Sequence, residues 1–144
     1  MVFRRCFGVS SVLLCALIVA VGVALAGEHP GSPVNCDIQQ GACTQRIDGR
    51  RVTLDVTPRP VRAMTELTFR VTVEERYAVP VARIELNMLA MDMGENHVPL
   101  KLNPKGGYQG RGVIVRCRSG IRTWSARVVL PGLGVAEFVF DVIY

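Results

Sequence analysis

Apolar and polar residues alternate along most of the chain from residue 51 onward. Successive side chains of an extended strand point to opposite faces, so this period of two predicts half-buried strands rather than helices. Proline and glycine residues divide the alternation into seven short runs. The predicted strands cover residues 52–57, 67–74, 83–88, 98–102, 108–117, 123–130 and 136–142.

Each predicted strand has one apolar and one polar face, which is typical of antiparallel sheets with one side in water. Two such sheets bury their apolar faces against each other. We therefore predict an all-β fold, an immunoglobulin-like antiparallel β-sandwich of about seven strands. A closed barrel is the alternative, because the alternation is the same in both. Trp124 shares the face of Ala126 and Val128, so it is expected to be a structural core residue.

The first 26 residues differ from the rest in both pattern and charge. Two arginines precede a long apolar stretch, and the sequence A-L-A over residues 24–26 has the small-x-small pattern of a signal-peptidase site. We predict that residues 1–26 are a signal peptide, with an uncleaved membrane-anchor helix as the alternative. Either would place the remaining chain in the periplasm or another extracytoplasmic space. Residues 27–50 are then expected to be a Cys-containing linker, and residues 51–144 the β domain.

Length and charge exclude several classes of function. The chain has 144 residues, with 17 Lys and Arg against 12 Asp and Glu and a formal net charge of +5. The charges are scattered with no run of five like charges, so no nucleic-acid partner is expected. One small domain fits this length, and a two-domain enzyme does not.

The five cysteines suit an oxidising compartment. Cys6 and Cys15 belong to the N-terminal segment, which leaves Cys36, Cys43 and Cys117 in the domain. Three cysteines allow one disulfide and leave one thiol. Cys43 is expected to pair with Cys36, closing a small local loop, or with Cys117.

Cys117 shares the strand face of Val113 and Val115, so it is expected to point into the core if they do. A reactive thiol needs a helix N-terminus or a neighbouring base that lowers its pKa. Neither is predicted beside Cys117, which favours a structural use over redox chemistry.

The densest group of soft metal ligands lies in one short stretch. It holds Met88, Met91 and Met93, with His97 at its end. Met91 and Met93 share one face of an extended chain, and Met88 takes the opposite face and is expected to turn into the core. Gly94 permits a bend that brings His97 back toward the sulfurs. Because thioether sulfur selects Cu(I), the expected metal ligands are Met91, Met93 and His97, and the expected ion is copper. The alternative is that these methionines fill the core.

Motifs for catalysis are missing from the sequence. It has no H-x-x-x-H, no C-x-x-C and no nucleophile elbow. The glycine-rich segment 106–112 is followed by no predicted helix, so it is expected to be a hairpin and strand rather than a phosphate-binding loop. We predict no catalytic residues, no cofactor other than copper, and a protein that is not an enzyme.

Three segments together resemble a known family. They are A-R-I-E-L-N-M-L-A-M-D-M-G over 82–94, G-G-Y-Q-G-R-G over 106–112 and C-R-S-G-I-R-T-W over 117–124. These segments resemble the YtkA-like and FixH-like extracytoplasmic domains, and the resemblance covers about residues 50–144. The family pattern falls on Met91, Met93, Gly94, Tyr108 and Trp124.

The resemblance implies an immunoglobulin-like domain with Gly94, Tyr108 and Trp124 in structural positions. It also implies a non-enzymatic accessory protein near copper delivery, since FixH-like members are membrane-anchored and are associated with assembly of respiratory oxidases. A metal-free module that recognises another envelope protein is the alternative. A thiol-active copper reductase or exchange factor is the third hypothesis, because the cysteines depart from the family pattern.

Overall fold

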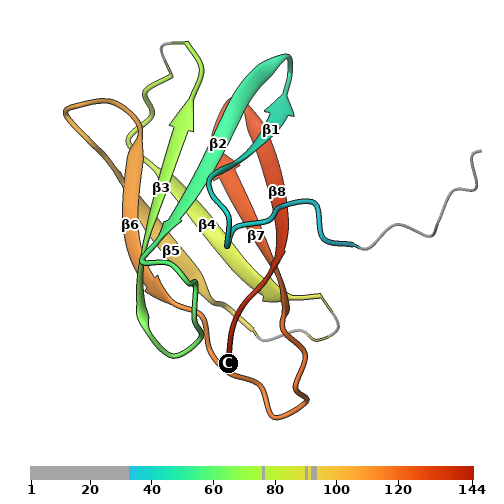
Figure 1. The fold of residues 1–144 in the computed structure, drawn as a ribbon. Coiled ribbons are helices and arrows are strands. Elements are labelled where there is room, and N and C mark those ends of the chain that lie inside the picture. Colours follow the sequence, from blue (N-terminus) through green and yellow to red (C-terminus); the bar gives the residue numbers. More distant parts are fainter. Residues whose placement is uncertain (1–32, 76, 90, 92–93) are drawn as a thin grey trace, which may run out of the picture.

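The computed structural model describes residues 33–75, 77–89, 91 and 94–144, which form a sheet of eight strands (Figure 1). The strands are β1 (Cys43–Ile47), β2 (Arg50–Thr57), β3 (Glu66–Val73), β4 (Ala82–Met88), β5 (His97–Leu102), β6 (Tyr108–Val113), β7 (Thr123–Leu130) and β8 (Gly134–Asp141). All pairs of these strands are antiparallel, and the described residues contain no helix. The predicted all-β antiparallel fold is therefore confirmed, with one strand, β1, beyond the seven expected.

The predicted signal peptide or anchor helix, residues 1–26, lies outside the described residues. Within the part that the structure describes, no helix has the length and apolarity needed to cross a bilayer.

The eight strands are hydrogen-bonded in the order β1-β2-β3-β6-β5-β4-β7-β8. Strand β5 joins the two halves of this sheet, because its residues 97–100 pair with β4 and its residues 101–102 pair with β6. The sheet curls until its end strands meet, since a Cβ added to Gly134 of β8 would lie 3.0 Å from Ile47 Cγ2 of β1. The architecture is one curled sheet that is nearly a barrel, close to the alternative that the sequence left open.

The segment before β1 covers the free edge of β8. The backbone N–H groups of Asn35 and Cys36 donate to the carbonyl of Val139 at 3.0 and 3.1 Å. The side-chain amide of Asn35 donates to the carbonyl of Glu137 at 3.1 Å and accepts from the N–H of Val139 at 2.8 Å. These bonds satisfy backbone N–H and C=O groups at the edge of β8, which if left unpaired would promote association with another sheet. Within residues 27–50, which the sequence suggests are a linker, the segment from Asn35 onward is thus bonded to the sheet.

A disulfide between Cys36 and Cys43 ties this segment to β1. Of the two pairings that the sequence left open for Cys43, the structure has the local one, and Cys117 is free. Cys36 and Ile38 are buried, so the segment is part of the core. An intramolecular disulfide fits an oxidising compartment.

Replacing Cys36 and Cys43 together by alanine is expected to lower the free energy of unfolding by about 2 kcal/mol. The cross-link joins residues separated by 7 positions, and a short loop restricts the unfolded chain less than a long one does. Urea unfolding of the variant and of wild type measures the difference, and wild-type protein in reductant should match the variant. Equal midpoints for oxidised wild type and the variant would contradict the prediction.

The core contains the large side chains that the alternation assigns to it. Trp124 is 0% exposed, which confirms its expected burial, and Met88 is 3% exposed, on the core side of β4 as predicted. Tyr108 is also buried, and its hydroxyl accepts the N–H of Val79 at 2.8 Å. Tyr108 therefore holds the connection between β3 and β4 against the sheet.

Cys117 is expected to point into the core if Val113 and Val115 do, and this condition is not met, because Val113 is exposed. Strand β6 ends at Val113, which is 40% exposed, and the next residue, Ile114, is fully buried. Buried positions therefore fall on Tyr108, Gly110 and Ile114, while Cys117 lies beyond the end of β6, partly exposed and packed against the edge of the core. Glycine carries no hydrophobic signal, so the neighbouring valines appear in the sequence to mark the core face.

The glycines of β6 make room for β5. A Cβ on Gly110 would lie 2.5 Å from the carbonyl oxygen of Pro99, and a Cβ on Gly112 would lie 2.5 Å from Val98 Cγ2. Val98 is buried against both glycines, at the place where β5 passes from one half of the sheet to the other. The glycine-rich segment thus has a packing role, as its expected hairpin-and-strand structure suggests.

Candidate functional site

Three loops lie at the end of the sheet where the C-terminus is located (Figure 1). They connect β2 to β3, β4 to β5 and β6 to β7. The thiol of Cys117, in the β6–β7 loop, donates to Met91 Sδ in the β4–β5 loop at 3.9 Å. Met91 is 47% exposed and Cys117 partly exposed, so this thiol–thioether pair is open to solvent.

Met64 adds a third sulfur from the β2–β3 loop. Its Sδ accepts the N–H of Arg116 at 3.4 Å, and Met64 and Cys117 line the same surface hollow. The φ angle of Met64 is 61°, in the left-handed region that non-glycine residues adopt at a cost. The backbone N–H of Met64 donates to the carbonyl of Ile114 at 2.8 Å, which holds this conformation. The loop backbone thus presents the Met64 side chain at the Cys117 loop.

Arginines are frequent in the loop that carries the thiol. Arg116 and Arg118 flank Cys117 and line its hollow. The guanidinium groups of Arg116 and Arg122 lie 5.4 and 5.9 Å from the centre of the Tyr144 ring. Among the ion pairs of the described residues, none involves these three arginines. Two cationic side chains, Arg116 and Arg118, therefore line this hollow.

The pKa of the Cys117 thiol is lowered, first by hydrogen bonds from the Ser119 hydroxyl and backbone, and then by the backbone of Arg118. A hydrogen bond to the charged form of a group stabilises that form. The sequence had not indicated this, because the donors come from a loop rather than from a helix N-terminus or a base.

Alkylation of Cys117 is expected to have its pH midpoint below the ordinary thiol value of 9.0. The thiolate is the nucleophile, so a lowered pKa increases the reactive fraction at neutral pH. Iodoacetamide kinetics across a pH series measures the midpoint in wild type and in Ser119→Ala, where the midpoint should rise toward 9.0. Identical midpoints in the two proteins would rule out the role of Ser119.

The predicted ligand His97 belongs to a different hollow from the sulfurs. It is exposed at the start of β5, paired in register with Glu85 of β4. The residues that line its hollow are Arg83, Glu85, Asn87, Gly94, Glu95, Asn96 and His97. Met93 lies outside the described residues, and Gly94 has a left-handed φ of 70°, which glycine adopts readily. The structure therefore brings Met91 to Cys117, while its expected partner His97 lines another surface.

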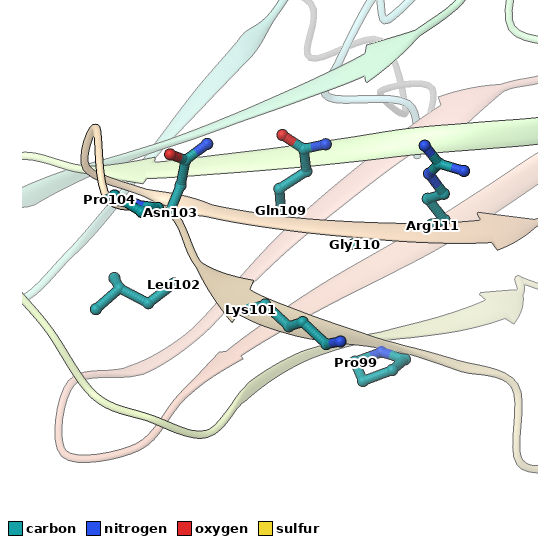
Figure 2. Close-up of a pocket in the computed structure, with 8 residues that line it drawn as sticks. All are labelled: Pro99, Lys101, Leu102, Asn103, Pro104, Gln109, Gly110 and Arg111. Atoms are coloured by element: carbon teal, nitrogen blue, oxygen red, sulfur yellow. The ribbon is translucent and has the colours of Figure 1, made fainter.

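A further hollow lies between β5 and β6, where these strands separate (Figure 2). The two strands pair only at Lys101 with Gln109 and at Leu102 with Tyr108. The lining residues are Pro99, Lys101, Leu102, Asn103, Pro104, Gln109, Gly110 and Arg111. The set combines apolar surface, two amides and two cationic side chains.

Comparisons with protein families, curated proteins and solved structures find no match to this chain. Among the described residues, no group of three or more His, Cys, Asp and Glu side chains is placed to hold a metal ion. The thioethers of Met64 and Met91 belong to a different ligand class, because they bind soft ions.

Sequence reasoning missed Met64 and the position of Cys117 beside Met91. The three residues come from loops that are distant in the chain, so no spacing connects them. The one local signal is the arginines on both sides of Cys117, which mark that loop as a polar surface segment rather than the end of a core strand.

Proposed function

We propose that this protein is a non-enzymatic extracytoplasmic accessory domain that binds Cu(I) through methionine sulfur and supplies it to a copper enzyme such as a respiratory oxidase. The observation that carries the proposal is the exposed side chain of Met91, with its Sδ 3.9 Å from the thiol of Cys117. Thioether and thiolate sulfur are soft ligands that select Cu(I). Met93 and His97, from the same segment, are the other ligands expected from the sequence.

The Cys36–Cys43 disulfide supports a location in the periplasm, reached through the N-terminal segment as a signal peptide or anchor. The resemblance to YtkA-like and FixH-like domains and the immunoglobulin-like sandwich are part of the proposal. The groups β1-β2-β3-β6 and β4-β7-β8, which meet at β5, are the candidate sheets of that sandwich.

Replacing Met91 and Met93 together by leucine is expected to weaken Cu(I) binding by about 100-fold. Removal of a residue that only hydrogen-bonds to a metal ligand already lowers metal affinity by about 10–100-fold. Leucine keeps the volume and apolarity of methionine, so the free energy of unfolding should fall by less than about 1.5 kcal/mol for each change. Titration with Cu(I) against a competing chelator measures the affinity of both proteins.

Met88→Leu is the matched control. Met88 is 3% exposed and faces the core, so the same chemical change there should leave Cu(I) affinity as in wild type. Wild type should also prefer Cu(I) to Zn(II), for which thioethers are poor ligands. Equal affinity of wild type and the double variant, or no binding by wild type, overturns the copper proposal.

The hollow between β5 and β6 favours a second candidate function, a metal-free module that recognises an acidic segment of another envelope protein. Lys101 and Arg111 supply the charge that attracts carboxylates, and Arg111 already contacts Glu66 at 3.3 Å. Replacement of Lys101 and Arg111 by glutamate should abolish capture of such a partner and leave Cu(I) affinity unchanged. This candidate becomes the leading one if wild type binds no Cu(I).

A further inference from the structure

Three sulfur atoms converge on one end of the sheet from three different loops. Cys117 Sγ lies 3.9 Å from Met91 Sδ, and Met64 shares a hollow with Cys117 while its Sδ holds the N–H of the neighbouring Arg116 at 3.4 Å. We propose that Cys117, Met91 and Met64 form a three-sulfur site for Cu(I). The inference rests on the proposed copper function and changes its ligand set, with Cys117 in place of His97.

The spacing of the first two sulfurs fits a shared metal ion. Three sulfur ligands in a plane around one ion, each at about 2.3 Å as in Zn–S bonds, lie about 4.0 Å from one another. The observed 3.9 Å between Cys117 Sγ and Met91 Sδ matches this separation without movement of either side chain. Both atoms belong to residues that are open to solvent, so an ion can reach the two sulfurs.

Met64 can reach the same ion by rotating its side chain. It is 65% exposed and unbranched, with three rotatable side-chain bonds. It gives up only the hydrogen bond from Arg116, and a thioether is a weak acceptor. The backbone of Met64 is meanwhile held in place by its bond to the carbonyl of Ile114.

The charges of the site favour a monovalent soft ion over a divalent one. Cu(I) bound to one thiolate and two thioethers has no net charge, whereas Zn(II) would leave a positive charge beside Arg116 and Arg118. Like charges at short range repel, and no described carboxylate forms an ion pair with these arginines. Thioether softness and site charge therefore select the same ion.

Binding at this site is a ligand exchange without electron transfer. The Cys117 S–H bond breaks, its proton passes to solvent, and the sulfur forms a bond to copper, which enters and stays as Cu(I). With Cys36 and Cys43 joined to each other, Cys117 is the free thiol of the described chain. Its exposure and that of the two methionines leave one side open, through which a partner's ligands can remove the ion.

The test compares Cys117→Ser, Met64→Leu and His97→Ala in the full chain, with Cys6 and Cys15 replaced by serine in every sample so that no other free thiol contributes. Cu(I) affinity is measured against a competing chelator, and the Cu(I)–thiolate absorbance is recorded in the ultraviolet. Cys117→Ser should lower the Cu(I) affinity by about 100-fold and abolish the absorbance. Met64→Leu should lower the affinity by about 10-fold. Both values follow the losses of about 10–100-fold seen when a residue that hydrogen-bonds to a metal ligand is removed. His97→Ala should bind as wild type does.

X-ray absorption at the copper edge of the wild-type complex gives an answer that depends on no variant. A shell of three sulfurs without imidazole scattering supports the site, and imidazole scattering overturns it. If His97→Ala loses affinity while Cys117→Ser does not, the three-sulfur site is wrong and the proposed copper function stands. If all three variants match wild type, the ion binds elsewhere and the inference falls. If wild type binds no Cu(I), the inference and the proposed function fall together.

Discussion

Trp124→Ala is expected to lower the free energy of unfolding by about 3–5 kcal/mol, the range for loss of a large buried aromatic side chain. Trp124 is 0% exposed and lies in β7, between its register partners Met88 of β4 and Phe140 of β8. Alanine leaves a cavity beside these neighbours that the hydrogen-bonded strands on both sides prevent from collapsing. Urea unfolding followed by circular dichroism measures the loss, because the variant lacks the only tryptophan of the chain.

Trp124→Phe is the control that separates the loss of filled volume from the loss of the indole N–H. The indole Nε1 of Trp124 is buried and has no hydrogen-bond partner among the described residues. Phenylalanine therefore removes part of the volume but no hydrogen bond, and should cost clearly less than alanine. Equal losses in the two variants would contradict the assignment of the stability to the volume that the ring fills.

The sequence was sufficient for the parts of the fold in which apolar side chains mark one face. Leu67, Phe69 and Val71 in β3 are fully buried, and the polar residues between them are not. Met88 lies on the same face of β4 as the buried Ile84 and Leu86, so its burial could be predicted from the alternation. A period of two fixes orientation wherever the inward positions are large and apolar.

Other parts leave no clear apolar pattern in the sequence. Strand β1 alternates half-buried and exposed residues, and its signal is the Asp48-Gly49 turn, whose φ angles of 52° and 81° close a hairpin with β2. In β6 the buried Gly110 gives no hydrophobic signal, so Val113 and Val115 marked the other face as the candidate core face for Cys117. The pairing of Cys117 with Met91 follows from the sheet order, which brings β6 and β4 to either side of β5.

Gly110→Ala is expected to lower the free energy of unfolding by about 3 kcal/mol, at the upper end of the usual range for overpacking. The added Cβ would lie 2.5 Å from the carbonyl oxygen of Pro99 and 2.7 Å from Val98 Cγ1. The first of these is a backbone atom, and the second belongs to a buried β-branched side chain that has little freedom to rotate. Relief therefore requires β5 to move away from β6 at the point where it connects the two halves of the sheet.

Gly41→Ala provides the matched control for this substitution. A Cβ on Gly41 meets nothing within 4 Å, and Gly41 has no left-handed φ, so alanine fits the existing backbone. Alanine there restricts the unfolded chain and should be neutral or stabilise the fold by about 0.4–1 kcal/mol. The urea midpoint of Gly110→Ala should then lie below that of wild type, and the midpoint of Gly41→Ala should equal or exceed it. A Gly110→Ala midpoint as high as that of Gly41→Ala would mean that β5 and β6 are not in close contact, and the glycines of the 106–112 segment would need another explanation.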